Sequence, residues 1–300
     1  MRILTYTVTP EEDGRMVKGI LRGSLQLSYT LLKSLKWCEN AILLNGQSVH
    51  VNTIVHAGDV VSVALSERTP REDLYCANAA KPDIVYEDDA LLAVRKPAPL
   101  QVHPSPSAPR GADTLEGRVQ SYLHSGAHPV HRLDAETTGI VLFAKLPYAQ
   151  AHIQRQMQTD AFRKEYLAWV CGVPAAPEGV IDAPIARLGT GAKRAVRPDG
   201  RRAVTHYRVE QAAGGRALIR LRLETGRTHQ IRVHLAHIGC PIIGDDKYGD
   251  RVGNRSFPAG LRLTATRIVF PNKLDGLEYL CGKSIEIEPP YNTQLIKNQL

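Results

Sequence analysis

The hydrophobic and polar positions of residues 1–66 predict a small folding unit that precedes the rest of the chain. Leucines three and four apart between residues 25 and 35 would share one face of a helix. Asn45-Gly46 separates two apolar runs, which is a strong short-range pattern for a tight β-hairpin. Residues 60–65 follow a second turn and predict a closing strand. These features indicate a small α/β unit.

The boundary of this unit is predicted within residues 67–83, which are polar, contain two prolines and show little periodicity. A chain of 300 residues has room for one large domain or two smaller ones. We therefore expect a first domain over residues 1–66, a linker over 67–83 and a second domain over 84–300.

Short apolar runs from residue 84 onward predict a domain made mostly of strands, with few helices. An amphipathic helix is expected over 147–158. A second is expected over 228–238, with Thr228 as its N-cap and Gly239 as the residue that ends it. The expected strands are 84–86, 91–94, 138–143, 165–170, 204–209 and 217–223.

The composition limits the classes of protein that this chain can belong to. A formal net charge of +8 suits a polyanionic partner such as nucleic acid, although solubility alone would also explain it. The five cysteines are scattered without a C-x-x-C pair, which is typical of reduced thiols in a cytoplasmic protein. Charges run through residues 1–20 and no apolar run reaches eighteen residues, so we expect neither a signal peptide nor a membrane span.

A carboxylate stands next to an arginine just before an apolar strand, in the run His131-Arg132-Leu133-Asp134. Burying a carboxylate costs several kcal/mol unless an opposite charge or hydrogen-bond donors compensate. Two interpretations of Asp134 remain open. It is either a nucleophile or charge stabiliser kept ionised by a nearby arginine, or a structural ion pair or helix cap.

A second group of polar residues begins at Gly226, where the chain can turn between a strand and a helix. Arg227 lies at that turn, where its guanidinium can point at a carboxylate or a phosphate. The histidines 229, 234 and 237 suggest zinc, but their spacing fits one helix face poorly and no H-E-x-x-H pattern accompanies them. We therefore expect no metal, and histidines that form hydrogen bonds near RNA or in the core.

Two further segments carry candidate chemistry. Tyr166, in Lys164-Glu165-Tyr166, is either an ordinary strand residue or a ring that stacks on a base or moves a proton. A basic segment that contains glycines predicts a mobile, cationic loop that suits phosphate contacts, although such a segment is commonly just a solvated face. Its basic residues are Arg187, Lys193, Arg194, Arg197, Arg201, Arg202 and Arg208.

Taken in order, these motifs resemble those of the RluA-type pseudouridine synthases over residues 84–290. Two positions differ from the usual family pattern, because Pro99 replaces a glycine and Thr138 replaces a serine. Residues 1–66 resemble an S4-type RNA-binding domain more loosely. The motifs that carry the family resemblance are residues 84–89, Lys96-Pro97 with His103-Pro104, residues 131–134 with 137–139, Lys164 with Tyr166, residues 226–232, and residues 241–245 with Tyr248.

The resemblance implies an α+β fold, in which a mixed, largely antiparallel bent β-sheet is flanked by helices and preceded by the small S4-like domain. It also implies isomerisation of uridine in structured RNA to pseudouridine, without cofactor or metal, by a cytoplasmic monomer. Large-subunit ribosomal RNA is the expected substrate. Transfer RNA remains an alternative, and so does a non-catalytic RNA-binding or ribosome-assembly protein on the same fold.

The resemblance further implies roles for single residues. Asp134 would be the nucleophile or base, Arg227 its ion-pair partner, and Tyr166 the ring that stacks on uracil and helps to remove the C5 proton. Arg132 would fill the space left by the extruded base. Whether Asp134 attacks C1′ or the C2′ proton is lost first stays open. The residues expected to bind substrate are Arg132, His131, Ile231, Lys164, Arg201 and Arg202.

Overall fold

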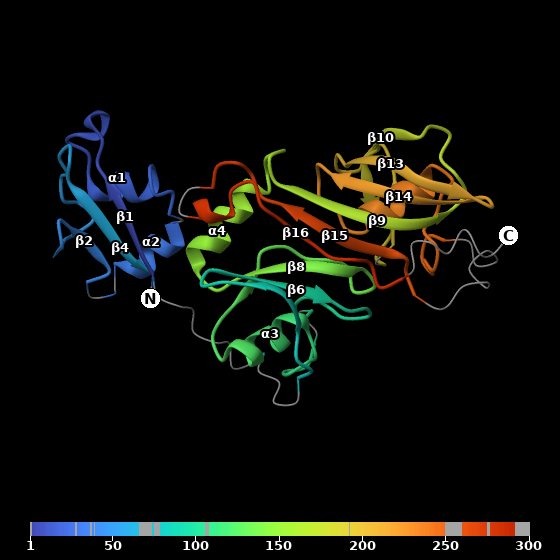
Figure 1. Cartoon of the computed structure of the whole chain (residues 1–300), viewed down its shortest axis with the longest axis horizontal. Helices are drawn as coiled ribbons and strands as arrows, with labels where there is room; N and C mark the ends of the chain where they lie inside the picture. The colour runs from blue at the N-terminus through green and yellow to red at the C-terminus, as the bar shows by residue number, and fades with distance from the viewer. Residues whose placement is uncertain are drawn as a thin grey trace.

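Two sheets of very different size organise the computed structural model (Figure 1). A small four-stranded sheet lies at the N-terminal end, and a ten-stranded sheet forms the centre of the larger domain. The structure describes residues 2–27, 29–36, 38, 40–65, 74, 79–105, 108–191, 193–249, 260–274 and 277–291.

The N-terminal unit is an antiparallel sheet in the order β1-β4-β2-β3, accompanied by two short helices. Asn45 and Gly46 have φ angles of 51° and 81°, so both central residues of the predicted hairpin turn are left-handed, as such a turn requires. The single helix expected over 25–35 is shorter, and another helix precedes it. The elements are β1 (Arg2–Thr7), α1 (Val17–Arg22), α2 (Tyr29–Leu35), β2 (Ile42–Leu44), β3 (Gln47–Ser48) and β4 (Val60–Leu65).

The predicted linker lies largely outside the described residues, but Leu74 within it is described and buried. A Cβ placed on Gly117 would come within 2.8 Å of the Leu74 carbonyl oxygen, so this part of the linker packs closely on helix α3 (Leu115–Leu123). At least one residue of the segment is therefore fixed to the larger domain.

The large sheet confirms the predicted fold class, because only the pairing of β15 with β8 is parallel among its described strands. Its order is β10-β13-β14-β9-β15-β8-β6-β5, with β16 added beside β15 and β7 beside β8. The strands are β5 (Asp83–Glu87), β6 (Leu91–Lys96), β7 (His128–Pro129), β8 (Thr138–Ala144), β9 (Arg163–Cys171), β10 (Glu178–Asp182), β13 (Val204–Ala213), β14 (Arg216–Leu223), β15 (Leu263–Val269) and β16 (Ser284–Glu286).

Strands β6 and β8 are almost entirely buried because both faces of the sheet are covered there. Along β8, Val141 and Phe143 belong to one core, while Ile140 and Leu142 belong to the core on the other face. The first core is closed by α3 and α5 (Gln230–His237), and the second by α4 (Pro147–Gln156). Two short 3-10 helices complete the described elements, Pro10–Glu12 and Glu278–Leu280.

Helix α4 also joins the two units (Figure 1). Tyr148 packs into the core of the N-terminal unit, where it is almost completely buried. Arg155 donates hydrogen bonds to the side-chain oxygen of Gln26 and, at 3.1 Å, to its backbone carbonyl. The N-terminal unit is thus docked on a helix of the larger domain.

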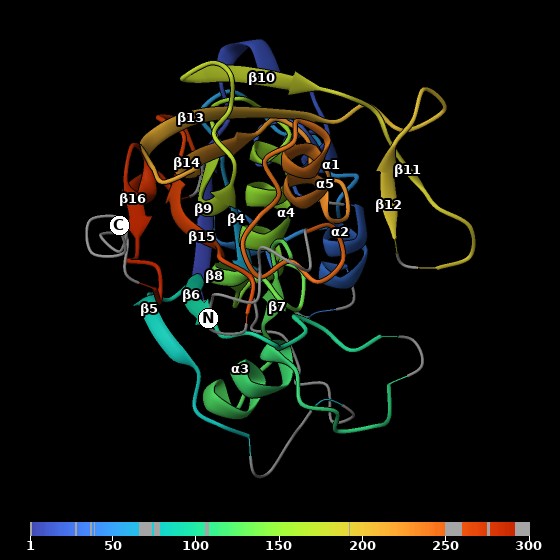
Figure 2. The same cartoon turned by 90° about the vertical axis from the view of Figure 1, so that its right-hand side faces the viewer.

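Much of the basic segment, expected to be a loop, forms a β-hairpin. Strand β11 (Ile185–Arg187) pairs with β12 (Arg194–Val196) in a separate two-stranded sheet. This hairpin extends to one side of the main body in Figure 2. Within the described part of the chain, no helix is long and apolar enough to cross a membrane.

The helix expected over 228–238 begins later than predicted, at Gln230. The N-cap position is occupied by His229, with a left-handed φ of 58°, and not by Thr228. The first turn is closed by the backbone instead, because the Gln230 N–H donates to the Arg227 carbonyl at 3.1 Å. Gly239, with a φ of 76°, follows the helix as predicted.

Candidate active site

Asp134 lies in the loop that joins β7 to β8, at the edge of a pocket of about 140 Å³. Two backbone hydrogen bonds shape the loop, from Thr137 N–H to the Asp134 carbonyl at 3.1 Å and from Leu100 N–H to the Ala135 carbonyl at 3.0 Å. The Asp134 side chain is half-buried, and its oxygens form no hydrogen bond or ion pair with any described residue. The carboxylate is therefore available to a ligand. We call this cavity the Asp134 pocket.

A fully buried lysine, Lys96, holds the Asp134 loop in place through hydrogen bonds. Lys96 ends strand β6, and its ammonium group has three N–H donors for three acceptors. Burial lowers the pKa of Lys96 to about 8, against the opposing effect of nearby carboxylates, so the group stays protonated at neutral pH. In the sequence, Lys96 stands out only as part of the Lys96-Pro97 motif. Its acceptors are the backbone carbonyls of Pro97 at 2.9 Å, Leu100 at 2.8 Å and Ala135 at 2.9 Å.

Tyr166 reaches the same pocket from β9, and its side chain is almost completely buried. Burial raises the pKa of the Tyr166 phenol, and the negative charge of Asp134 raises it further. Its hydroxyl has no hydrogen-bond partner among the described residues. The ring is thus a neutral phenol beside the Asp134 carboxylate.

A close approach of two strands holds Asp134 and Tyr166 in register. Gly139 lies in β8 with a φ of 121°, and a Cβ there would come within 2.3 Å of the Ala265 carbonyl oxygen in β15. Ala265 in turn pairs with Tyr166. Only glycine permits this parallel contact, which places the Asp134 loop next to β9.

The Arg227 loop, between β14 and α5, is held by the side chain of Gln230. Its amide oxygen accepts hydrogen bonds from Arg227 N–H at 3.0 Å and from the Thr225 hydroxyl at 2.8 Å. Arg227 Nε donates to the Arg202 carbonyl at 2.9 Å. The ion pair expected between Arg227 and Asp134 is not formed, although both residues line the pocket. The guanidinium of Arg227 is instead hydrogen-bonded through Nε to the Arg202 carbonyl.

Arg232 is a buried cation at the site that sequence reasoning did not single out. It forms a two-pronged ion pair with Asp245, with both contacts at 2.8 Å, and a third contact of 3.3 Å with Glu136. Its guanidinium also lies over the Tyr248 ring, 5.3 Å from the centroid. Two neighbouring motifs of the sequence, 226–232 and 241–248, are thereby joined, and their presence together is the sequence signal for this contact.

Two of the three histidines that suggested a metal have other partners. His229 Nδ1 contacts the Tyr248 hydroxyl at 2.7 Å. His234 is completely buried and contacts Thr205 Oγ1 and the Ala183 carbonyl, both at 2.9 Å. Burial lowers the pKa of both histidines. In the described part of the chain, no three His, Cys, Asp or Glu side chains gather as a metal site would require.

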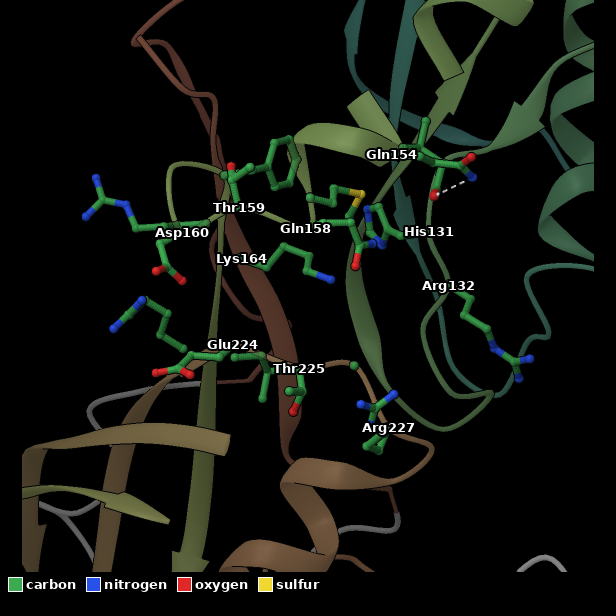
Figure 3. A pocket seen from close by; sticks show the side chains of 17 residues that line it. His131, Arg132, Gln154, Gln158, Thr159, Asp160, Lys164, Glu224, Thr225 and Arg227 are labelled. Atoms are coloured by element: carbon green, nitrogen blue, oxygen red, sulfur yellow. Dashed lines mark hydrogen bonds between the residues drawn. The ribbon is translucent and has the colours of Figure 1, made fainter. Parts of the chain in front are cut away.

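A second cavity of about 540 Å³ adjoins the Asp134 pocket, and we call it the outer pocket (Figure 3). Lys164 points into it, and burial lowers the pKa of its ammonium group. His131 lines its wall and accepts the Leu142 N–H at Nε2 over 3.2 Å. Burial lowers the pKa of His131 to about 3, with a further contribution from the Lys164 charge. The walls shared by the two pockets are Arg132, Lys164, Leu223, Gly226 and Arg227.

The structure brings most of the predicted site residues together. Arg201 and Arg202 line neither of these two pockets. They lie beside the β11–β12 hairpin, where Arg201 bridges to Ile185 and Arg202 pairs with Glu224 at 3.5 Å. The predicted residues that line the Asp134 pocket are Asp134, Tyr166, Arg227, Arg132, Lys164 and Ile231.

Comparison with known proteins identifies the class to which this fold and site belong. The family model described as RNA pseudouridylate synthase matches residues 90–237. "Uncharacterized RNA pseudouridine synthase YjbO" of Bacillus subtilis (strain 168) is 37% identical over 232 residues, which cover 76% of this chain and 81% of that protein. "Ribosomal large subunit pseudouridine synthase D" of Pasteurella multocida (strain Pm70) is 38% identical over 226 residues, covering 72% of this chain and 67% of that protein.

Another relative spans nearly the whole chain. "Uncharacterized RNA pseudouridine synthase YhcT" of Bacillus subtilis (strain 168) is 31% identical over 299 residues, covering 97% of this chain and 94% of that protein. Among solved structures, "Human RNA Pseudouridylate Synthase Domain Containing 4" matches with a TM-score of 0.54 and 28% identity, covering 69% of this chain and 88% of that chain. This chain belongs to the RluA-type RNA pseudouridine synthase family. It is an intramolecular isomerase that acts on RNA.

Proposed function

We propose that the enzyme converts a uridine of large-subunit ribosomal RNA to pseudouridine as a monomer, with Asp134 as the group that reacts at the ribose. The observation that carries the assignment of Asp134 is its carboxylate, half-buried beside Tyr166 and unpaired among the described residues. The ribosomal substrate is supported by relatives named ribosomal large subunit pseudouridine synthase, at 36–38% identity.

The reaction breaks the N1–C1′ bond of uridine, turns the base and joins C5 to C1′. A carboxylate beside C1′ can stabilise or trap the oxocarbenium-like centre that forms when the base departs, as in retaining glycosidases. In the alternative route Asp134 takes the C2′ proton. Both routes need the carboxylate in its ionised form.

Tyr166 serves in this proposal as a stacking surface and hydrogen-bond donor for uracil. Because burial and the Asp134 charge raise the pKa of its phenol, the hydroxyl keeps its proton at neutral pH. A phenol cannot accept the C5 proton, so the final deprotonation falls to another group. Asp134, once released from the ribose, is the nearby carboxylate that can accept the C5 proton.

The target base has to leave its stack before it can reach Asp134, which costs a few kcal/mol. Arg132 is exposed and extends away from the other labelled side chains, so it is free to occupy the space left by the base (Figure 3). Ile231, which is almost completely buried, forms an apolar wall that limits water around the reacting sugar.

Binding of a large RNA is assigned to two regions outside the Asp134 pocket. Arg201 and Arg202, beside the β11–β12 hairpin, would contact phosphates and so position the RNA without reading its sequence. The N-terminal unit, residues 1–66, would act as an S4-like RNA-binding domain. It contains a four-stranded antiparallel sheet and two short helices.

Tritium release from RNA labelled at uracil C5 tests the proposed activity and the class of RNA. Ribosomal and transfer RNA from a strain that lacks the gene would be incubated with wild type and with Asp134→Asn. We expect release from large-subunit ribosomal RNA with wild type only, and a loss of more than about 10³-fold in the variant, whose amide cannot act as a nucleophile or base.

RNA affinity serves as the control for Asp134→Asn. It should stay within a few fold of wild type, because the substitution keeps the shape of the side chain. Turnover retained by the variant, or affinity lost with turnover, would overturn the role of Asp134. Release from transfer RNA alone would replace the ribosomal substrate with the alternative one.

A further inference from the structure

We propose that the outer pocket binds the nucleotide that flanks the target uridine, with Lys164 on the phosphate between the two nucleotides and Gln158 on the flanking base. This inference rests on the proposed function, because it requires a uridine in the Asp134 pocket. It adds a second position at which the enzyme would read its RNA.

The two pockets adjoin each other and share one wall. Lys164 and Arg227 line both of them, and Lys164 extends into the outer pocket from the shared wall (Figure 3). An RNA strand with its target base in the Asp134 pocket therefore has its next phosphate close to these two cations. The adjoining base then has the outer pocket as its nearest cavity.

The charge of the outer pocket suits a phosphodiester. Five of its lining side chains are cationic and two are carboxylates. Of the two carboxylates, Glu224 is already engaged by Arg202 and by His206, the latter at 2.6 Å. Lys164 has no ion-pair partner among the described residues. A half-buried ammonium group without a counter-ion gains most from a phosphate. The cationic residues are Arg132, Arg163, Lys164, Arg222 and Arg227.

The opposite wall of the outer pocket suits a base. Phe162 is buried and fixed by an edge-to-face contact with Phe270, with the ring centroids 5.7 Å apart. Beside it, the Gln154 amide is held by a 3.1 Å hydrogen bond to the Val130 carbonyl. Gln158 is exposed, and its side-chain amide makes no hydrogen bond to a described residue. The N–H donors and the oxygen acceptor of this side chain are therefore available for a base edge. Bases of single-stranded RNA are commonly read in this way, splayed from their neighbours and bonded on their edges.

An abasic substitution tests the subsite directly. Once the target uridine is mapped, RNA fragments would carry an abasic residue at each flanking position in turn, and kcat/KM would be measured by tritium release. We expect one of these positions to lower kcat/KM of wild type by about tenfold or more, the usual loss when a bound base is removed.

The variant Gln158→Ala shows whether the outer pocket is responsible. It should lower kcat/KM about fivefold on intact RNA, mainly through KM, and less than about twofold on the sensitive abasic RNA, because contacting groups give non-additive losses. Gln156→Ala is the matched control, since Gln156 ends helix α4 two residues before Gln158 and does not line the pocket. It should change neither value.

Additive losses, or no loss from either change, would overturn the outer pocket as a base subsite. These outcomes differ from a failure of the proposed function. In that case wild type would release no tritium even from intact RNA.

Discussion

At the scale of single residues, the candidate site depends on buried groups as well as on the side chains that line its pockets. Lys96 illustrates this, because its ammonium group holds the loop that carries Asp134 through the Ala135 carbonyl. The sequence could predict Asp134 and Tyr166 from their motifs. It could not predict the structural roles of Lys96 and Arg232, because these roles depend on acceptors from distant parts of the chain, such as the Ala135 carbonyl and Glu136.

Lys96→Met should destabilise the fold by about 3 kcal/mol, since three buried carbonyls lose their donors. It should also lower kcat more than KM, because the variant mispositions Asp134 without altering the RNA contacts. Urea denaturation and tritium-release kinetics measure the two effects. Lys145→Met is the control, because its ion pair with Glu87 lies at the surface end of β8 and should contribute less than about 1 kcal/mol. Equal losses in kcat/KM from both variants would contradict a positioning role for Lys96.

His131 gives the fold a predictable dependence on pH. Its pKa of about 3 in the folded chain lies below the ordinary value of 6.5, so between these values only the unfolded chain takes up the proton. This contribution to stability is therefore complete above pH 6.5 and is lost as the pH falls toward 3. By pH 5 the loss should be about 2 kcal/mol.

The variant His131→Gln isolates this effect. The difference in unfolding free energy between wild type and the variant should shrink by about 2 kcal/mol between pH 7 and pH 5. The exposed His237, changed to Gln, is the control and should leave its own difference constant. Urea denaturation at both pH values is the measurement. A difference in unfolding free energy that stays constant for His131→Gln would show that the imidazole takes up its proton as readily in the folded chain as in the unfolded chain.

At the scale of secondary-structure elements, the pattern of apolar residues predicted six strands of the large sheet, of which β6 and β8 are buried on both faces. It did not predict β10, β15 or β16, whose sequences contain several polar or charged residues. It missed α3, whose first turns contain Gly117 and several polar residues. It also missed the β11–β12 hairpin, whose strands are only three residues long and each contain one arginine. The parallel pairing of β8 with β15 joins residues more than a hundred positions apart, and no local pattern encodes it.

Gly139→Ala tests that pairing. The added Cβ would meet the Ala265 backbone at 2.3 Å, so β8 and β15 must separate. We expect a loss of about 3 kcal/mol or more in unfolding free energy, together with loss of turnover. Gly215→Ala is the control, because its φ is also positive, at 70°, but nothing lies within 4 Å of the added atom. It should cost about 1 kcal/mol. Similar costs for the two variants would mean that the strands can separate easily.

At the scale of the whole molecule, the cations are spread widely, and RNA affinity should depend on contacts outside the pockets. Replacing both Arg201 and Arg202 by Ala should weaken binding and reduce the slope of log affinity against log salt by about 1 to 2. Filter binding at several salt concentrations measures this slope. Arg118→Ala, which removes a cation already paired with Asp113, is the control and should leave the slope unchanged. An unchanged slope in the double variant would remove these arginines from the interface.

The docking of the N-terminal unit on α4 has a consequence for how such enzymes diversify. Tyr148 completes the core of the N-terminal unit, although its own helix belongs to the larger domain. The N-terminal unit is therefore not a domain that can be exchanged without changes to α4. Loss or replacement of this unit exposes the Tyr148 ring and leaves Arg155 of α4 without its Gln26 partner. Further substitutions on α4 are then needed to keep the shortened enzyme from aggregating.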